Sequence, residues 1–360
     1  MNHVLIISTK IGGINTITSE ITKHLKSIGL EVTVLYFEEI TSKTLLHILT
    51  KWYLKPIPKI FHWWSILYKY AGIYPLFFNS LQKVIKNPKR IYPGAFDVVS
   101  LRKPDHIIAT SFFPSFVIQH LVHYFSLQTK THAIITNFDF PKFWSKSFDY
   151  YYVPNKEILE IGKSNGYEGN KLIIQNIPIS RHVVIKEKMN LPKKSILFLG
   201  GSLGLNISIQ KIKVASNTDY EIIVVCGENK KTYNRISKLF GKKIKCFQTL
   251  SSEELYLLYE TCVCVVTKAG TLTLAEAAFR KIPIILSSSL EGHERKNANF
   301  LIDRNACMKG FKITDFKKAL TDLSDLSIIT PIVNAAYNLF NPDINNSILK
   351  PVLYVDKRIS

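Results

Sequence analysis

Short apolar runs of strand length alternate along the whole chain with longer segments of helical periodicity. Such runs are typical of parallel strands that are buried on both faces beneath covering helices. In the first half the predicted strands are Val4–Ser8, Val32–Tyr36, His106–Ala109, Ala133–Thr136, Tyr151–Val153 and Leu172–Ile174. In the second half they are Ile196–Leu199, Ile222–Val225, Ile244–Phe247, Val263–Val266 and Ile284–Leu286. The pattern predicts an α/β protein with two doubly wound, Rossmann-like domains facing a cleft.

The alternation is interrupted by a polar, charged segment that begins at Ile177-Pro178 and ends at Leu191-Pro192. Because 360 residues exceed what one hydrophobic core usually organises, we place a domain boundary there. We predict an N-terminal domain over residues 1–180 and a C-terminal domain over 190–330. A helical tail over 331–360 is expected to pack back on the N-terminal domain. Ser251 and Glu254 form a capping-box pattern that predicts a helix start.

The net charge is strongly positive, with 47 Lys and Arg against 27 Asp and Glu, a formal +20. An excess of this size fits a polyanionic partner, either nucleic acid or anionic lipid, and a general lysine bias remains the alternative. The five cysteines are odd in number and lie mostly in apolar runs without metal-ligand spacing, which indicates reduced core residues, a cytoplasmic protein and no metal site. They are Cys226, Cys246, Cys262, Cys264 and Cys307.

A basic, aromatic segment at about residues 43–93 does not fit the alternation. It holds nine Lys or Arg between Lys43 and Arg90, and no acidic residue occurs between Glu39 and Asp97. Cations beside Trp and Tyr suit a lipid headgroup layer, so we predict a membrane-binding arm on a peripheral protein. A helical insertion packed on the first domain is the alternative. Nucleic acid is not expected, because no RNA- or DNA-binding signature accompanies the arm. The predicted membrane residues are Lys51, Trp52, Lys55, Lys59, Trp63, Trp64 and Lys69.

One segment of the second domain combines a strand, a small-residue turn and a helix that opens with hydroxyl residues. The free amides and positive dipole end of such a helix form an anion site suited to a diphosphate, to which Gly270, Thr271 and Thr273 would contribute. Glu276 lies one turn further on the same face, where its carboxylate could accept from ribose hydroxyls. An ordinary helix after a buried strand is the alternative, with Lys268 merely solvated.

The run K-A-G-T-L-T-L-A-E-A from Lys268 to Ala277, followed by E-G-H-E up to Glu294 and by Asn297, resembles a known donor-binding segment. It is that of the monogalactosyldiacylglycerol synthase and processive diacylglycerol glucosyltransferase family, related to the lipid II-forming N-acetylglucosaminyltransferase of glycosyltransferase family 28. The family motif reads K-A-G-G-x-T-x-x-E-A and then P-G-Q-E-x-x-N. The resemblance extends from Val4 to about Ala306. It includes Pro104–Pro114, Thr136–Phe138, Asn176–Ile179 and Phe198–Gly204.

The resemblance implies the GT-B glycosyltransferase fold and an inverting transfer of a hexose or N-acetylhexosamine from a UDP-sugar to a hydroxyl of a membrane lipid, without a tightly bound cofactor. The acceptor would be of diacylglycerol or polyprenyl type. Implied donor-binding residues are Gly201, Ser202, Gly204, Gln248, Thr249, Leu250, Lys268, Gly270, Thr271, Thr273, Glu276, His293 and Glu294. Implied acceptor-binding residues are Gly12, Gly13, Phe113 and Asn137.

The first loop departs from the family motif G-G-G-H, whose histidine is thought to be the general base. Here that position is Ile14 or, with a shift of one residue, Asn15, and neither accepts a proton near neutral pH. Asp139 and His106 are substitute candidates, although His106 also fits a core position. Three classes therefore stay open: a glycosyltransferase with a displaced base or none, a degenerate UDP-sugar-binding or membrane-recruiting subunit, and a UDP-sugar epimerase.

Overall fold

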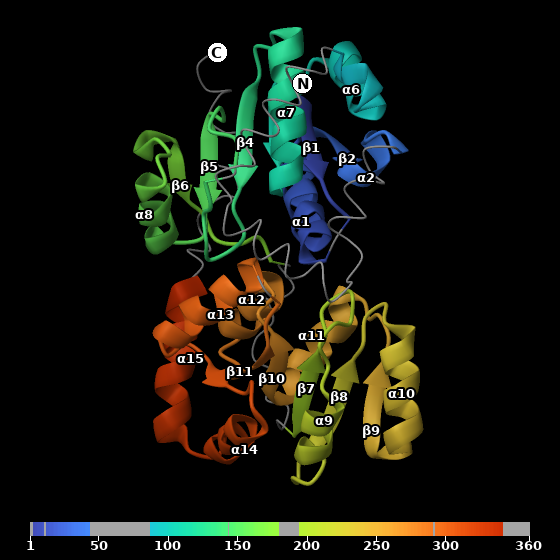
Figure 1. Cartoon of the computed structure of the whole chain (residues 1–360), viewed down its shortest axis with the longest axis vertical. Helices are drawn as coiled ribbons and strands as arrows, with labels where there is room; N and C mark the ends of the chain where they lie inside the picture. Colours follow the sequence, from blue (N-terminus) through green and yellow to red (C-terminus); the bar gives the residue numbers. More distant parts are fainter. Residues whose placement is uncertain are drawn as a thin grey trace. The chain divides into compact units, whose positions relative to one another are not determined.

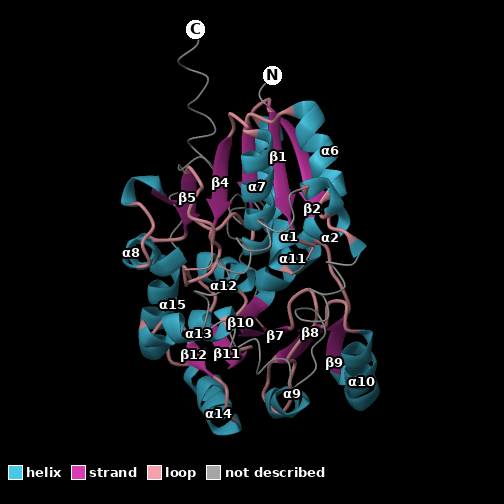
Figure 2. Ribbon diagram, turned by 45° about the horizontal axis from the view of Figure 1, so that its top comes forward, coloured by secondary structure: helices cyan, strands magenta, loops and turns pink. Residues whose placement is uncertain are grey.

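The computed structural model describes residues 3–10, 12–43, 87–142, 144–179, 194–290 and 292–340. They divide into two compact units, with the boundary between Pro178 and Ile179 (Figure 1). Each unit contains a six-stranded sheet with flanking helices (Figure 2). All strand pairs within both sheets are parallel, which confirms the predicted doubly wound architecture.

The first unit has the strand order β2-β1-β3-β4-β5-β6. The chain therefore steps to one side of β1 for β2 and to the other side for β3, which makes the gap between β1 and β3 the switch point of this sheet. The strands are β1 (His3–Ser8), β2 (Glu31–Tyr36), β3 (His106–Ala109), β4 (Lys130–Ile134), β5 (Tyr150–Val153) and β6 (Leu172–Ile174). The α-helices are α1 (Gly13–Ser27), α2 (Phe37–Ile40), α6 (Pro93–Arg102), α7 (Phe112–Phe125) and α8 (Lys156–Ser164). Two 3₁₀ turns are η1 (Pro88–Arg90) and η2 (Gly169–Lys171).

The second unit has the order β12-β11-β10-β7-β8-β9, so its switch point lies between β7 and β10. Its strands are β7 (Ser195–Leu199), β8 (Glu221–Val225), β9 (Ile244–Phe247), β10 (Cys262–Lys268), β11 (Ile284–Ser288) and β12 (Met308–Lys309). Its α-helices are α9 (Ile209–Ala215), α10 (Lys230–Phe240), α11 (Ser252–Thr261), α12 (Thr271–Phe279), α13 (His293–Asp303), α14 (Ile313–Asp322) and α15 (Leu326–Phe340). A 3₁₀ turn, η4 (Gly241–Lys243), links α10 to β9.

Eleven strands were predicted, and all eleven are present. The prediction for β4 was three residues late at its start and ran two residues past its end, because the strand opens with polar residues. Thr131 and His132 are nonetheless buried there, since Asp149 accepts from the Thr131 hydroxyl at 2.8 Å and Tyr152 bonds the His132 ring at 3.0 Å. The two-residue strand β12 was missed.

The starts and the packing of two helices of the second unit bear on the sequence predictions. The predicted capping box is confirmed at the start of α11, where the Ser251 hydroxyl accepts from the Glu254 amide at 3.1 Å and the Glu254 carboxylate accepts from the Ser251 amide at 2.7 Å. Helix α15 packs against α12 of the second unit. This helix contains residues 331–340 of the predicted tail. Residues 341–360 lie outside the described ranges, so the packing of that part of the tail stays a prediction. Within the described ranges, no helix combines the length and apolar composition needed to cross a bilayer.

Candidate functional site

The loops after β7 and β10 emerge side by side at the switch point of the second sheet. Leu199, the last residue of β7, is in register with Thr267 of β10, and the Thr267 hydroxyl donates to the Leu199 carbonyl at 3.1 Å. Ligands of open α/β sheets bind outside the carboxyl ends of the strands at such a point. The geometry therefore makes this edge the candidate site of the second unit.

The loop after β7 contains glycines in a backbone conformation that favours glycine. Gly201 and Gly204 have φ angles of 68° and 58°, in the left-handed region. A Cβ atom on Gly204 would lie 1.7 Å from the carbonyl oxygen of Cys226. The Asn229 side chain donates to the Gly204 carbonyl at 3.0 Å and so fixes the loop against the start of α10. Ser202 is exposed at its tip.

The turn after β10 leads directly into α12, which begins at Thr271 as predicted. Its N-cap is Gly270, without a side-chain cap. The fully buried Asn297 of α13 donates to the Ala269 carbonyl at 3.2 Å and to the Thr271 hydroxyl at 3.1 Å, which fixes the turn. Thr273 lies half-buried in the first turn of α12. Amides at a helix N-terminus favour an anion, so the turn suits a phosphate.

Lys268 lies between the two loops. This half-buried lysine forms an ion pair with the buried Glu294, whose other carboxylate oxygen accepts from the Leu290 amide at 3.1 Å. Cβ positions built on Gly201 and Gly270 would each lie 3.2 Å from the Lys268 side chain, so the lysine passes along both turns. The alternative of a solvated lysine at this strand end is therefore wrong.

Glu276 is held by a residue that the sequence did not indicate. The Tyr259 hydroxyl of α11 donates to the Glu276 carboxylate at 2.9 Å, and only 2% of Tyr259 is exposed. Burial, and then the Glu276 charge, raise the pKa of Tyr259 well above its usual value, so the hydroxyl keeps its proton and remains a donor. Arg280 stacks over the Tyr259 ring at 5.2 Å and pairs with Glu260 at 2.6 Å. In the sequence, Tyr259 had only the pattern of a core aromatic.

The remaining predicted donor residues occupy the same edge of the sheet. The loop after β9 carries exposed Gln248 and Thr249 and the half-buried Leu250. His293 is the first residue of α13, which follows β11, while the preceding Glu291 lies outside the described residues. The structure thus places all the predicted donor residues after the carboxyl ends of β7, β9, β10 and β11. Their individual roles stay predictions.

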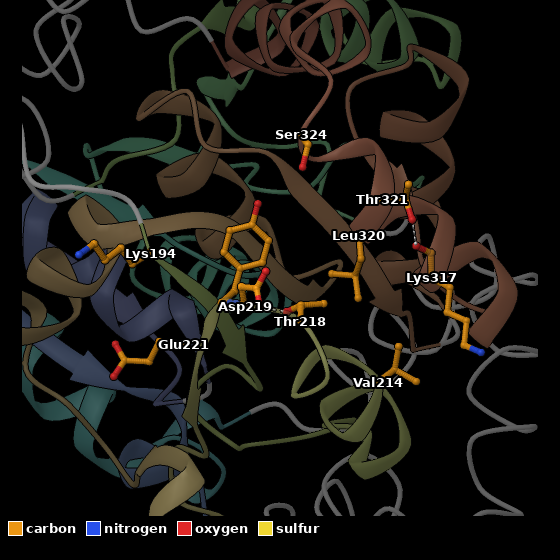
Figure 3. A pocket seen from close by; sticks show the side chains of 10 residues that line it. Lys194, Val214, Thr218, Asp219, Glu221, Lys317, Leu320, Thr321 and Ser324 are labelled. Carbon is orange, nitrogen blue, oxygen red and sulfur yellow. Dashed lines mark hydrogen bonds between the residues drawn. The ribbon is translucent and has the colours of Figure 1, made fainter.

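A pocket at the opposite edge of the second sheet is not part of this site. Figure 3 shows its lining, which includes Lys194 just before β7, Glu221 at the start of β8, and Lys317 of α14. Lys194 and Glu221 lie at the amino ends of their strands, away from the loops that gather at the switch point. The pocket wall mixes lysines with acidic and apolar side chains, without the glycine turns or the helix N-terminus described above.

In the first unit, the loop after β1 lies at the corresponding switch point. Gly12, with φ of 61°, immediately precedes α1, which starts at Gly13. Three buried hydroxyls fasten the base of the loop, since Ser8 bonds Thr18 at 2.6 Å and Thr110 donates to Ser8 at 2.8 Å. The loop is therefore fixed to β3 as well as to α1.

The two residues at the position of the family histidine face different surroundings. Ile14 is half-buried, and the exposed Asn15 accepts from the Tyr36 hydroxyl at 2.9 Å through its side-chain oxygen. Neither side chain is a base. The other predicted acceptor residues follow neighbouring strands of this sheet. Phe113, in the first turn of α7, stacks on Phe37 at 5.6 Å, and Asn137 lies in the loop after β4.

The two substitute bases are placed very differently. His106 begins β3 at the amino edge, is 1% exposed, and bonds its ring to the His132 ring at 3.0 Å. It cannot reach a substrate at the carboxyl edge, so its interpretation as a base was wrong and its interpretation as a core residue is confirmed. Asp139 is 7% exposed and follows the carboxyl end of β4, on the same loop as Asn137.

The predicted membrane residues of the arm all lie outside the described residues, from Lys51 to Lys69. The five cysteines are free thiols; four are buried and Cys246 is half-buried. Within the described ranges, no group of three His, Cys, Asp or Glu residues has a metal-binding arrangement.

Each unit is similar to a known protein family. Residues 195–320 match the glycosyltransferase family 28 C-terminal domain, and residues 15–179 match monogalactosyldiacylglycerol (MGDG) synthase. The first match lies within the second unit, and the second match covers the first unit from residue 15 and ends one residue past the boundary, in the order that the sequence motifs predicted. The resemblance is therefore confirmed, as is the predicted fold of two Rossmann-like domains.

Individual relatives are distant. An uncharacterized glycosyltransferase, YkoN of Bacillus subtilis (strain 168), is 26% identical over 58% of this chain and 57% of its own length. The processive diacylglycerol beta-glucosyltransferase of Bacillus licheniformis is 27% identical over 65% of this chain and 66% of its own length. The chain thus matches less than two thirds of either relative.

Solved structures share the fold at low identity. MurG of Acinetobacter baumannii has a TM-score of 0.59 at 13% identity, with 95% of this chain and 96% of that chain covered. The UDP-GlcNAc 2-epimerase of Neisseria meningitidis, bound to UDP-GlcNAc, gives the same TM-score and identity, with 95% and 97% covered. These likenesses confirm the GT-B fold and do not distinguish transferase from epimerase.

Proposed function

We propose that this protein transfers a hexose or N-acetylhexosamine from a UDP-sugar to a hydroxyl of a membrane lipid, with inversion at the anomeric carbon. The observation on which the proposal rests is the site after β7 and β10, where the glycine loop and the start of α12 adjoin within a domain that matches glycosyltransferase family 28. The similarity to processive diacylglycerol beta-glucosyltransferases supports a lipid acceptor.

The proposed donor contacts follow from the chemistry of the edge. The diphosphate would lie at the first turn of α12, which begins at Thr271 beside Gly270 and the glycine loop, where the positive helix end stabilises the negative charge of the UDP leaving group. The Glu276 carboxylate, oriented by Tyr259, would accept from the ribose hydroxyls. His293 and Glu294, at the start of α13, would contact the sugar.

The acceptor side is proposed from the first unit. A lipid hydroxyl would approach the loop at Gly12 and Gly13, close in the fold to the start of α7 at Phe113. We propose Asp139 as the base, because its carboxylate follows the carboxyl end of a strand, β4. His106 lies at the amino end of β3. We place the protein at the cytoplasmic surface of a membrane, held peripherally by its positive charge.

A second function is favoured by one observation, the absence of a titratable side chain at Ile14 and Asn15. In this alternative the protein is a UDP-sugar-binding subunit that recruits partners to a membrane without transferring sugar. Both functions require nucleotide binding, so binding alone does not separate them.

The test combines donor binding with product analysis. A panel of UDP-sugars is first screened for thermal stabilisation, since a bound donor stabilises the folded state by mass action. The preferred radiolabelled donor is then incubated with mixed lipid vesicles. Label in the lipid phase supports the transferase, binding without product supports the subunit, and a new water-soluble sugar nucleotide supports an epimerase. Stabilisation by none of the donors would contradict the transferase and the subunit together.

The role of Asp139 has its own variant. Asp139→Asn keeps the size of the side chain and removes its basicity. We expect the preferred donor to stabilise the variant as before, while transfer falls by roughly 100-fold or more, the usual contribution of a general base. Unchanged transfer would show that the base lies elsewhere.

A further inference from the structure

A second cationic segment, distinct from the arm, lies in the described part of the C-terminal unit. No acidic residue occurs between Glu228 and Glu253, although the intervening stretch holds seven Lys or Arg. Elsewhere in this unit the charges are interleaved. On α14, for example, Lys318 pairs with Asp322 at 2.6 Å. The uninterrupted run therefore differs from an ordinary solvated surface.

The fold gathers six of these cations on one surface at the end of the sheet. Helix α10 packs along the edge strand β9 (Figure 1). It buries Ile236, while its basic residues are exposed. The turn η4 continues the same connection with two further exposed lysines. We name this surface the α10 basic face, and it consists of Lys230, Lys231, Arg235, Lys238, Lys242 and Lys243.

The described part of the protein does not neutralise the charges of this face. The seventh cation of the run, Lys245 on β9, pairs with Glu221 at 2.6 Å. Among the described residues, none of the six members of the α10 basic face has an ion pair. Lys230 and Lys231 also occupy the first turn of α10, where the helix dipole favours acidic residues and none is present. Exposed cations without ion pairs, two of them at the positive end of a helix, indicate an anionic partner.

An apolar side chain among the cations indicates which anion. Leu239 is 57% exposed on the outer side of α10, next to Lys238. An exposed aliphatic side chain within a cationic surface suits the headgroup and upper acyl layer of a bilayer. Single-stranded nucleic acid is bound by exposed aromatic rings, whereas Tyr233 and Phe240, the aromatic residues of α10, are half-buried.

We propose that the α10 basic face binds an anionic lipid surface and gives the C-terminal domain a membrane contact of its own. The proposal extends the proposed function, because a lipid acceptor places the protein at a membrane. It does not depend on sugar transfer, on the arm at residues 43–93, or on the donor residues. Binding should weaken as salt rises, because exposed charges are screened within a Debye length of about 10 Å at 0.1 M.

The test compares two variants with equal loss of charge in the full chain. The first, K238Q/K242Q/K243Q, removes half of the α10 basic face and lies outside the donor loops. The matched control, K312Q/K317Q/K318Q, removes three exposed lysines at α14 of the same unit. Vesicles of phosphatidylcholine, with and without phosphatidylglycerol, are floated with each protein. The first variant should bind the anionic vesicles at least tenfold more weakly than wild type, since each lysine near an anionic bilayer strengthens binding roughly fivefold.

The control variant should bind within about threefold of wild type. Equal loss in both variants would mean that only net charge matters, and unchanged binding of the first variant would remove the face from the contact; either result overturns the proposal. So would a loss of single-stranded oligonucleotide binding with vesicle binding retained. Thermal unfolding is measured on the same samples with and without UDP. The melting temperature without UDP reports folding, and its increase with UDP reports the donor site. A failure of sugar transfer with vesicle binding intact would therefore count against the proposed function alone.

Discussion

Replacing Tyr259 with phenylalanine removes a single hydroxyl from the wall of the proposed ribose site. That hydroxyl donates to the Glu276 carboxylate at 2.9 Å, and both residues are buried. A hydrogen bond to a charged group contributes about 1.5–3 kcal/mol to stability. With about 2 kcal/mol lost, the C-terminal domain should melt roughly 4–8 °C lower.

The effect on binding should depend on the ribose. A carboxylate that accepts from a ribose hydroxyl should favour UDP over 2′-deoxy-UDP by about tenfold, equivalent to 1.4 kcal/mol. Without Tyr259, Glu276 is no longer held in one orientation, so Tyr259→Phe should reduce this preference to about threefold or less. Because the raised pKa of Tyr259 keeps its hydroxyl protonated, the wild-type preference should be constant between about pH 6.5 and 9.

The matched control is Tyr256→Phe. Tyr256 lies on the same helix, is also buried, and stacks on Arg280 at 4.3 Å, but its hydroxyl does not contact Glu276. Calorimetric titration of UDP and 2′-deoxy-UDP against each variant gives the ratio of the two affinities for that variant. If Tyr259→Phe weakens UDP and 2′-deoxy-UDP equally, or if Tyr256→Phe changes the ratio as much, Tyr259 has a structural role and does not position Glu276.

Three further predictions concern stability. Gly204→Ala should abolish stabilisation by UDP or prevent folding, because its Cβ would lie 1.7 Å from a backbone carbonyl oxygen. Gly241→Ala, which also has a positive φ but open space around its Cβ, should lower the free energy of unfolding by only about 1–3 kcal/mol. Lys268→Met should lower the free energy of unfolding by about 3–5 kcal/mol, since it leaves the Glu294 carboxylate buried without its cation. A loss below about 1 kcal/mol would contradict this prediction, because it would show that water already solvates the ion pair. Burial raises the pKa of Tyr152 above its usual value of 10.0, so above about pH 10 the folded state binds more protons than the unfolded state and the free energy of unfolding falls. Tyr152→Phe should make this fall less steep in urea titrations between about pH 9.5 and 11. An unchanged dependence of the free energy of unfolding on pH would contradict the prediction.

Much of the fold was predictable because its signals are local. Buried parallel strands are continuous apolar runs, and each of the eleven predicted runs is a strand. The start of α12 at Thr271 follows from the small residues before it, and the start of α11 from the capping box at Ser251. Since parallel strands share one carboxyl edge, the order of strands and loops also placed the predicted donor residues together.

The pairing of side chains across the site could not be predicted from local pattern. Lys268 meets Glu294, and Tyr259 meets Glu276, because separate segments of the chain pack against one another at the sheet. These contacts depend on the strand order, which periodicity does not specify. For His106 the secondary structure was predictable and the surroundings of the side chain were not. Its position in a strand was predicted, but its burial against the His132 ring follows from the pairing of β3 with β4.

The measurement that tests the central proposal most directly is transfer of label from the preferred radiolabelled UDP-sugar into the lipid phase, by wild type and by Glu276→Gln. The substitution keeps the shape of the side chain and removes the charge that would accept from the ribose. We predict lipid-soluble product from wild type and at least tenfold less from the variant at a donor concentration below saturation. Binding of the donor by wild type without any lipid-soluble product would contradict the proposed transferase.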